Sequence, residues 1–71
     1  MRNIETNERV GARIAEKRKE LGIDKSELGR RIGKKYLMVH RYERGTESVT
    51  LPVLEKLCRE FGCTASELLG F

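Results

Sequence analysis

Apolar residues recur along the chain at helical spacing, and glycines interrupt them. Val10, Ile14 and Leu21 are spaced to form one face of a first helix, with Asn7 as its N-cap and Gly22 at its end. No segment alternates apolar and polar residues as a half-buried strand does, and no Asn-Gly pair marks a hairpin turn. The pattern therefore predicts an all-α protein.

Four further helices are predicted, each bounded by a capping residue or a glycine. Asp24 and Glu27 form a capping-box pattern before the second helix, and Gly33 ends it. Thr50 caps the fourth helix, and Thr64 opens the last. The predicted helices cover residues 8–21, 25–32, 36–43, 51–61 and 65–69. We expect a single domain over residues 1–71, folded as a compact five-helix bundle.

The cysteine count argues against a metal centre or a disulfide framework. Cys58 and Cys63 are the only cysteines, and His40 is the only histidine. A structural zinc site needs four such ligands, and a small disulfide-stabilised domain needs more cysteines and a secretory signal. We therefore predict no metal and no other cofactor.

The sequence predicts neither a signal peptide nor a membrane span. Residues 1–7 contain no apolar stretch, and no apolar run approaches the length of a membrane-spanning helix. We expect a soluble, cytoplasmic protein that does not bind membranes.

Positive charge is concentrated in the middle of the chain. The net charge is +4 and the pI is about 9.4. Residues 13–44 hold eleven Lys or Arg against five Asp or Glu, whereas residues 45–71 hold two against four. This asymmetry favours one face for a polyanion, but many basic domains do not bind nucleic acid, so charge alone leaves the function open.

The second and third helices are too short to be stable alone. Their tight glycine-containing connection fits a helix-turn-helix unit, in which the second helix of the pair enters the major groove of DNA. An ordinary helical hairpin in a small bundle fits the same spacing. The spacing by itself does not decide between the two.

From Val10 to Leu69 the sequence resembles the phage-repressor and Cro type of helix-turn-helix, known as the XRE family. The matching segments, in order, are Arg13-Ile14 to Leu21-Gly22, Ser26-Glu27-Leu28-Gly29, Val39 to Gly45 with its Glu-x-Gly signature, Leu54 to Gly62, and Ser66-Glu67-Leu68-Leu69. The resemblance implies a lambda-repressor-like fold with the helix-turn-helix formed by helices two and three.

The resemblance also implies a DNA-binding site. The base-reading positions of the family fall on Lys35, Tyr36, Leu37 and Arg41, and the phosphate-contacting positions on Lys25, Lys34, Arg44 and Ser48. Arg41 can donate two hydrogen bonds to guanine, and Leu37 can pack on a thymine methyl group. The alternative is a solvated helix face, which is the interpretation we give to Arg30 and Arg31.

Arg18 and Glu43 correspond to a pair that forms an internal salt bridge in some members of the family. Two departures from the family pattern concern lysines. Lys25 stands where most members have Gln, and Lys35 stands where Ser or Thr usually caps the recognition helix. A lysine side chain accepts no hydrogen bond from the helix N–H groups, so the third helix is expected to lack a side-chain cap.

The leading functional hypothesis is a transcriptional regulator, namely a repressor that binds double-stranded DNA as a homodimer at a pseudo-palindromic operator. The resemblance implies a dimer contact in the C-terminal segment, residues 63–71, where family members often dimerise. Leu68, Leu69 and Phe71 make this segment apolar and are the candidate dimer interface, although part of this apolar surface is expected to fill the core. The alternative is an antitoxin or adaptor that uses the same fold to bind a protein partner. An enzyme is not expected, because no catalytic triad, phosphate-binding loop or metal cluster is present.

Overall fold

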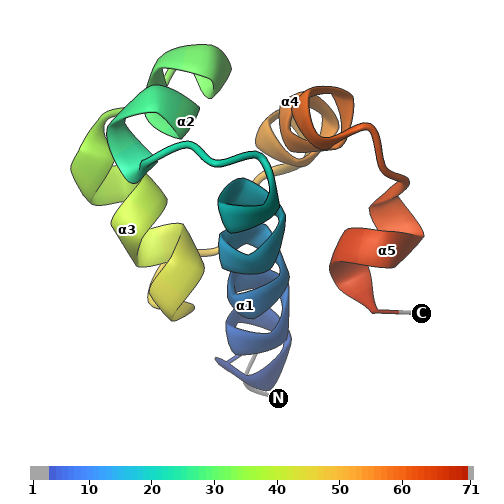
Figure 1. The fold of residues 1–71 in the computed structure, drawn as a ribbon. Helices are drawn as coiled ribbons and strands as arrows, with labels where there is room; N and C mark the ends of the chain where they lie inside the picture. Colours follow the sequence, from blue (N-terminus) through green and yellow to red (C-terminus); the bar gives the residue numbers. More distant parts are fainter. Residues whose placement is uncertain (1–3, 71) are drawn as a thin grey trace.

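The computed structural model describes residues 4–70, and these form five α-helices without a strand. The helices are α1 (Ile4–Glu20), α2 (Lys25–Ile32), α3 (Tyr36–Arg44), α4 (Leu51–Phe61) and α5 (Ala65–Leu69). Helix α1 lies between the α2–α3 pair and the α4–α5 pair and packs against α3, α4 and α5 (Figure 1). The all-helical fold expected from the sequence is confirmed.

Helix α1 begins earlier than the predicted range of residues 8–21. It starts at Ile4, so Asn7 lies inside the helix and is not its N-cap. The Asn7 side-chain amide instead donates a hydrogen bond to Ser48 Oγ at 3.0 Å, in the loop before α4. The prediction that Leu21 belongs to the buried face of this helix is also wrong. Leu21 follows the end of α1 and is 43% exposed.

Side-chain caps define where α2, α4 and α5 begin. Asp24 accepts a hydrogen bond from the Glu27 N–H at 2.8 Å, Thr50 accepts from the Val53 N–H, and Thr64 accepts from the Glu67 N–H. These bonds satisfy N–H groups that the helices leave without an internal partner. The predicted capping roles of Asp24, Thr50 and Thr64 are therefore confirmed, unlike that of Asn7.

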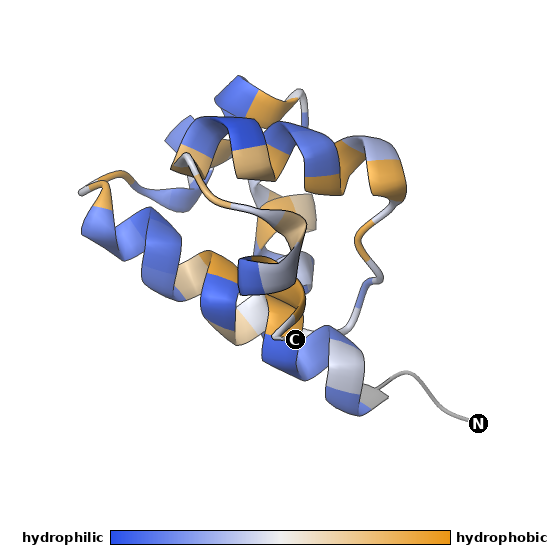
Figure 2. Cartoon of the chain, turned by 90° about the vertical axis from the view of Figure 1, so that its right-hand side faces the viewer, coloured by the Kyte–Doolittle hydropathy of each residue, from blue (hydrophilic) through white to orange (hydrophobic). Residues whose placement is uncertain are grey.

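Each helix contributes apolar side chains to one core. Apolar and polar segments alternate along the helices, as expected when each helix buries one face (Figure 2). The buried apolar residues are Val10, Ile14, Leu28, Ile32, Val39, Tyr42, Val53, Leu54, Leu57 and Leu68. Burying one such aliphatic side chain contributes roughly 1.5–3 kcal/mol. This core fixes α2 and α3 against the rest of the domain.

The position of Leu68 corrects the predicted dimer interface. Its side chain is 0% exposed and belongs to the core, so it has no surface to offer a second copy. The next residue, Leu69, is half-buried and packs against the core from outside. Phe71, the third residue of that prediction, lies outside the described residues.

Candidate nucleic-acid interface

Helices α2 and α3 are joined by a turn of three residues, Gly33 to Lys35. Gly33 has a φ of 74°, a left-handed conformation that favours glycine, and the Lys34 N–H donates to the Gly29 carbonyl at 2.8 Å. A Cβ atom at Gly29 would overlap the carbonyl oxygen of Lys34 and approach Val39 Cγ2 at 3.4 Å. A residue without a Cβ atom is therefore needed at position 29 for the turn to pack against α2.

Helix α3 is anchored by its buried face. Val39 is 0% and Tyr42 is 3% exposed, and both lie in the core. The four predicted base-reading residues are all exposed, with Tyr36 and Leu37 each at 52%. The exposed side of α3 therefore carries aromatic, aliphatic and basic side chains together.

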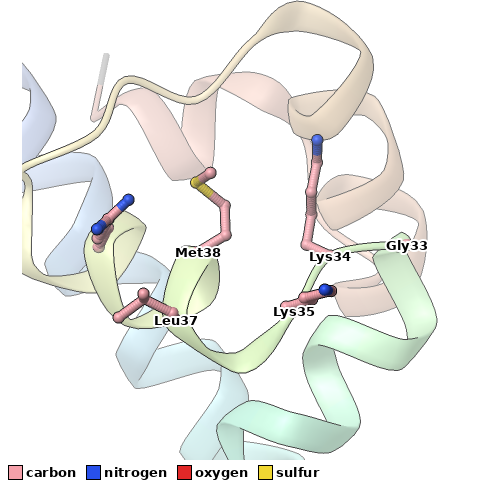
Figure 3. Close-up of a pocket in the computed structure, with 6 residues that line it drawn as sticks. Gly33, Lys34, Lys35, Leu37 and Met38 are labelled. Carbon is pink, nitrogen blue, oxygen red and sulfur yellow. The ribbon is translucent and has the colours of Figure 1, made fainter.

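Three of the four predicted base-reading residues line one hollow of about 330 Å³. Lys35, Leu37 and Arg41 lie around it together with Gly33, Lys34 and Met38. In the close-up, Lys34 and Met38 extend in the same direction, one from the turn and one from α3 (Figure 3). Leu37 and Met38 give the hollow an apolar surface, while Lys34, Lys35 and Arg41 surround it with positive charge.

Tyr36, the fourth predicted base-reading residue, lies apart from that hollow and next to Lys25 and His40. Its ring is stacked on the His40 ring, with centroids 6.1 Å apart and an angle of 9° between the planes. Lys25 Nζ is 5.8 Å from the centre of the Tyr36 ring and 3.0 Å from His40 Nδ1. The structure therefore brings Lys25, a predicted phosphate-contacting residue, next to Tyr36, a predicted base-reading residue.

The other predicted phosphate-contacting residues are placed at both ends of α3. Lys34 precedes the helix and is half-buried, and Arg44 is exposed in its last turn. Ser48 is exposed in the loop after α3, where its hydroxyl accepts the hydrogen bond from Asn7. At the start of α2, the Asp24 carboxylate already accepts the Glu27 N–H. The Glu27 N–H group is therefore already bonded, so a phosphate at the start of α2 would need other N–H groups or side chains.

Lys35 stands at the N-cap position of α3 and makes no side-chain capping hydrogen bond. Its backbone is extended, with φ −80° and ψ 160°, as is usual for an N-cap. The ammonium group is left exposed beside the hollow. Helix α3 thus begins without the polar cap that α2, α4 and α5 each have.

Arg18 and Glu43 hold α3 against α1. Arg18 Nε donates to Glu43 Oε2 at 2.7 Å, and Arg18 Nη2 donates to Glu43 Oε1 at 3.1 Å. The two side chains are 11% and 6% exposed. The hydrogen bond to Glu43 raises the pKa of Arg18, although burial opposes it. The pair fixes the C-terminal end of α3, close to the predicted base-reading residue Arg41.

Arg30 and Arg31 pair with Glu27 within α2, and Arg31 Nη1 also lies 3.7 Å from Glu60 Oε1 on α4. Both guanidinium groups donate to the Glu27 carboxylate, Arg30 Nη2 at 2.6 Å and Arg31 Nε at 2.9 Å. The hydrogen bonds from Arg30 and then Arg31 lower the pKa of Glu27 to about 2. Their charge is therefore partly neutralised on the surface of α2, which agrees with their interpretation as a solvated face.

The remaining chemistry-bearing residues form no further site within residues 4–70. No group of three His, Cys, Asp or Glu side chains is placed there to hold a metal ion. Cys58 and Cys63 are free and half-buried, and burial raises the pKa of the Cys63 thiol. No helix in the same range is long and apolar enough to cross a membrane.

Sequence reasoning did not assign His40 or Asn7 to the site region. His40 contacts residues four and fifteen positions away, and Asn7 bonds to a residue 41 positions away. The spacing of Tyr36 and His40, one helical turn apart, was the only local signal for either contact.

Comparisons with known proteins place this geometry in a family. The helix-turn-helix family model matches residues 14–68. Among curated proteins, no sequence relative is found. The P22 c2 repressor, solved with a synthetic operator, is similar to this chain with a TM-score of 0.81 and 28% identity, over 84% of this chain and 91% of that one.

Two further solved structures are similar over most of their length. The restriction-modification controller protein C.AhdI from Aeromonas hydrophila gives a TM-score of 0.86 and 25% identity, over 96% of this chain and 99% of that one. The DNA-binding domain of BldD gives a TM-score of 0.80 and 28% identity, over 93% of this chain and 96% of that one. The chain therefore belongs to the XRE-type helix-turn-helix family of DNA-binding transcriptional regulators.

Proposed function

We propose that this protein is a sequence-specific repressor that binds a pseudo-palindromic operator as a homodimer, with α3 in the major groove. The observation that carries the proposal is the exposed face of α3. Tyr36, Leu37 and Arg41 are exposed there, and Lys35 stands at the N-cap position just before them. The opposite face is fixed by Val39, Tyr42 and the Arg18–Glu43 pair. A rigidly held helix with an exposed polar face is the form in which helix-turn-helix proteins read DNA.

Each base-reading side chain has a chemical role. Arg41 donates two parallel hydrogen bonds to guanine O6 and N7, and Lys35 donates to the same kind of acceptor. Leu37, on the apolar side of the hollow, packs on a thymine methyl group. Tyr36 presents a hydroxyl group and the exposed part of its ring. These roles favour a site that contains both G·C and A·T pairs.

The phosphate contacts set the register of α3 in the groove. Lys25, Lys34 and Arg44 supply cations at the start of α2 and at the two ends of α3, and Ser48 supplies a hydroxyl group beyond it. Contacts of this kind carry affinity and salt dependence but little sequence information. They orient the protein on the duplex so that the exposed face of α3 meets the base edges.

Dimerisation follows from the size of the recognition surface. One recognition helix covers only a few base pairs, and two copies on half-sites about one helical turn apart give a specific site. The P22 c2 repressor, one of the similar proteins, is a repressor studied on an operator. Of the predicted interface residues within residues 4–70, Leu68 is buried in the core and Leu69 is partly exposed, so we assign the contact with a second copy to Leu69.

The test is selection of bound duplexes from a random library at near-physiological salt, followed by sequencing. The proposal predicts a two-fold-symmetric motif with half-sites about one helical turn apart. An asymmetric motif would contradict the dimer, and binding without enrichment would contradict sequence-specific recognition. In the latter case, capture of a defined protein partner would favour the adaptor or antitoxin hypothesis.

A further inference from the structure

His40 lies on α3 and contacts one residue of its own helix and one residue of α2. Its Nδ1 atom is 3.0 Å from Nζ of Lys25 on α2, and its ring is stacked on Tyr36 of α3. We propose that His40 is a positioning residue that holds the Lys25 ammonium group in place for a DNA phosphate. The inference rests on the proposed role of Lys25 in phosphate binding.

The direction of the hydrogen bond follows from the donors available. A lysine ammonium group only donates, so the contact requires Nδ1 of His40 to accept. The ring proton of neutral His40 is then on Nε2. Because the ammonium group has three N–H donors, one directed at His40 leaves two for phosphate oxygens. His40 therefore orients the cation without competing with the phosphate.

Tyr36 keeps the His40 ring in the required orientation. The two rings lie one helical turn apart on α3 and are nearly parallel, at 9°. Lys25 Nζ also lies 5.8 Å from the centre of the Tyr36 ring, within the range of a cation–π attraction. The ammonium group thus has two attractive partners on α3, and both act before DNA is present.

The advantage of this arrangement is entropic. A free lysine side chain populates many rotamers and loses that freedom when it binds a phosphate. Lys25 is already half-buried and restrained by α3, so less freedom is left to lose on binding. His40 is itself half-buried, and its effect on affinity is exerted through Lys25.

The experiment compares two substitutions of His40 in two backgrounds. His40→Asn places a side-chain oxygen at about the position of Nδ1, whereas His40→Leu keeps similar bulk and removes the acceptor. Each is measured with Lys25 intact and in the Lys25→Met background, by titration of the selected duplex. Circular dichroism and thermal unfolding show that each variant is folded at the measuring temperature.

With Lys25 intact, His40→Leu is expected to weaken DNA binding about three- to tenfold, the range for ordering one flexible side chain. His40→Asn is expected to bind within about twofold of the unaltered protein, because one neutral acceptor replaces another. In the Lys25→Met background, His40→Leu is expected to cause no further loss. An equal loss in both backgrounds would overturn the inference.

A second readout needs no DNA. The ¹⁵N shifts of the His40 ring in the free protein report which nitrogen carries the proton, and we expect Nε2 to carry it. Lys25→Met is expected to shift the ring toward a mixture of tautomers, and an unchanged spectrum would overturn the inference. Absence of DNA binding by the unaltered protein would instead overturn the proposed function, and the ring spectrum would still decide whether His40 holds Lys25.

Discussion

Arg18 on α1 and Glu43 on α3 form a two-point hydrogen-bonded ion pair, with N–O distances of 2.7 and 3.1 Å and little exposure of either side chain. Arg18 Nη1 also donates to the Ile23 carbonyl at 2.9 Å, in the loop that leads to α2. One buried guanidinium group therefore connects α1, the entry to α2 and the end of α3. The orientation of the recognition helix depends on this pair.

Arg18→Ala is expected to lower the free energy of unfolding by about 3–5 kcal/mol, because Glu43 would be left buried without its partner. It is also expected to weaken DNA binding. Urea unfolding followed by circular dichroism measures the first effect. The double variant Arg18→Met with Glu43→Leu is the control, because it removes both charges and is expected to recover most of the loss. An unfolding midpoint unchanged by Arg18→Ala would contradict the role of the pair.

Lys34→Ala is expected to weaken binding to all duplexes alike and to lower the slope of log affinity against log salt by about one. The reason is that a phosphate contact releases a counterion whatever the base sequence. Arg59→Ala is the matched control, since it removes the same charge from an exposed position on α4 where Arg59 pairs with Glu55. Equal changes in slope for the two variants would show that Lys34 acts only through net charge.

Gly29→Ala is expected to destabilise the domain by roughly 1–3 kcal/mol, the usual cost of inserting a carbon into a packed region. The added Cβ would overlap the Lys34 carbonyl oxygen and displace the turn that leads into α3. Thermal unfolding measures the effect. Ser26→Ala, at an exposed position of the same helix, is the control and is expected to leave the unfolding temperature nearly unchanged. Similar unfolding temperatures for both variants would refute the tight packing of the turn.

Leu69→Ser is expected to weaken binding to a duplex with two half-sites more than binding to a duplex with one. Leu69 is half-buried, and we propose that its side chain contacts a second copy of the chain. Sedimentation of the protein with each duplex gives the stoichiometry, and titration gives the affinities. A loss of equal size on both duplexes would assign Leu69 to the fold of the domain and not to dimerisation.

Local signals explain why much of the fold could be predicted from the sequence. The Asp24 cap and the glycine after α2 act on neighbouring residues, so the helix-turn-helix unit is readable from a short stretch. The start of α1 was not readable in this way. Asn is a residue type that often caps helices, but the Asn7 side-chain amide donates to Ser48 in a distant loop. Helix α1 therefore continues past Asn7 and begins at Ile4.

Packing decides the features that the sequence left open. Leu68 and Leu69 are adjacent and equally apolar, and only the docking of the short α5 determines that Leu68 is buried and Leu69 is partly exposed. The sequence around His40, a single histidine in a basic segment, indicated no role for it. Its function as a partner of Lys25 arises when α2 and α3 pack together and bring the two residues within 3.0 Å.

The most direct test of base reading by α3 is to repeat the duplex selection with Arg41→Ala. Arg41 is exposed beside the hollow and is the residue best suited to guanine. We expect the affinity to fall by about 1–3 kcal/mol and the motif to lose its preference at one base pair in each half-site, with the other positions retained. An unchanged motif would contradict recognition through this face of α3.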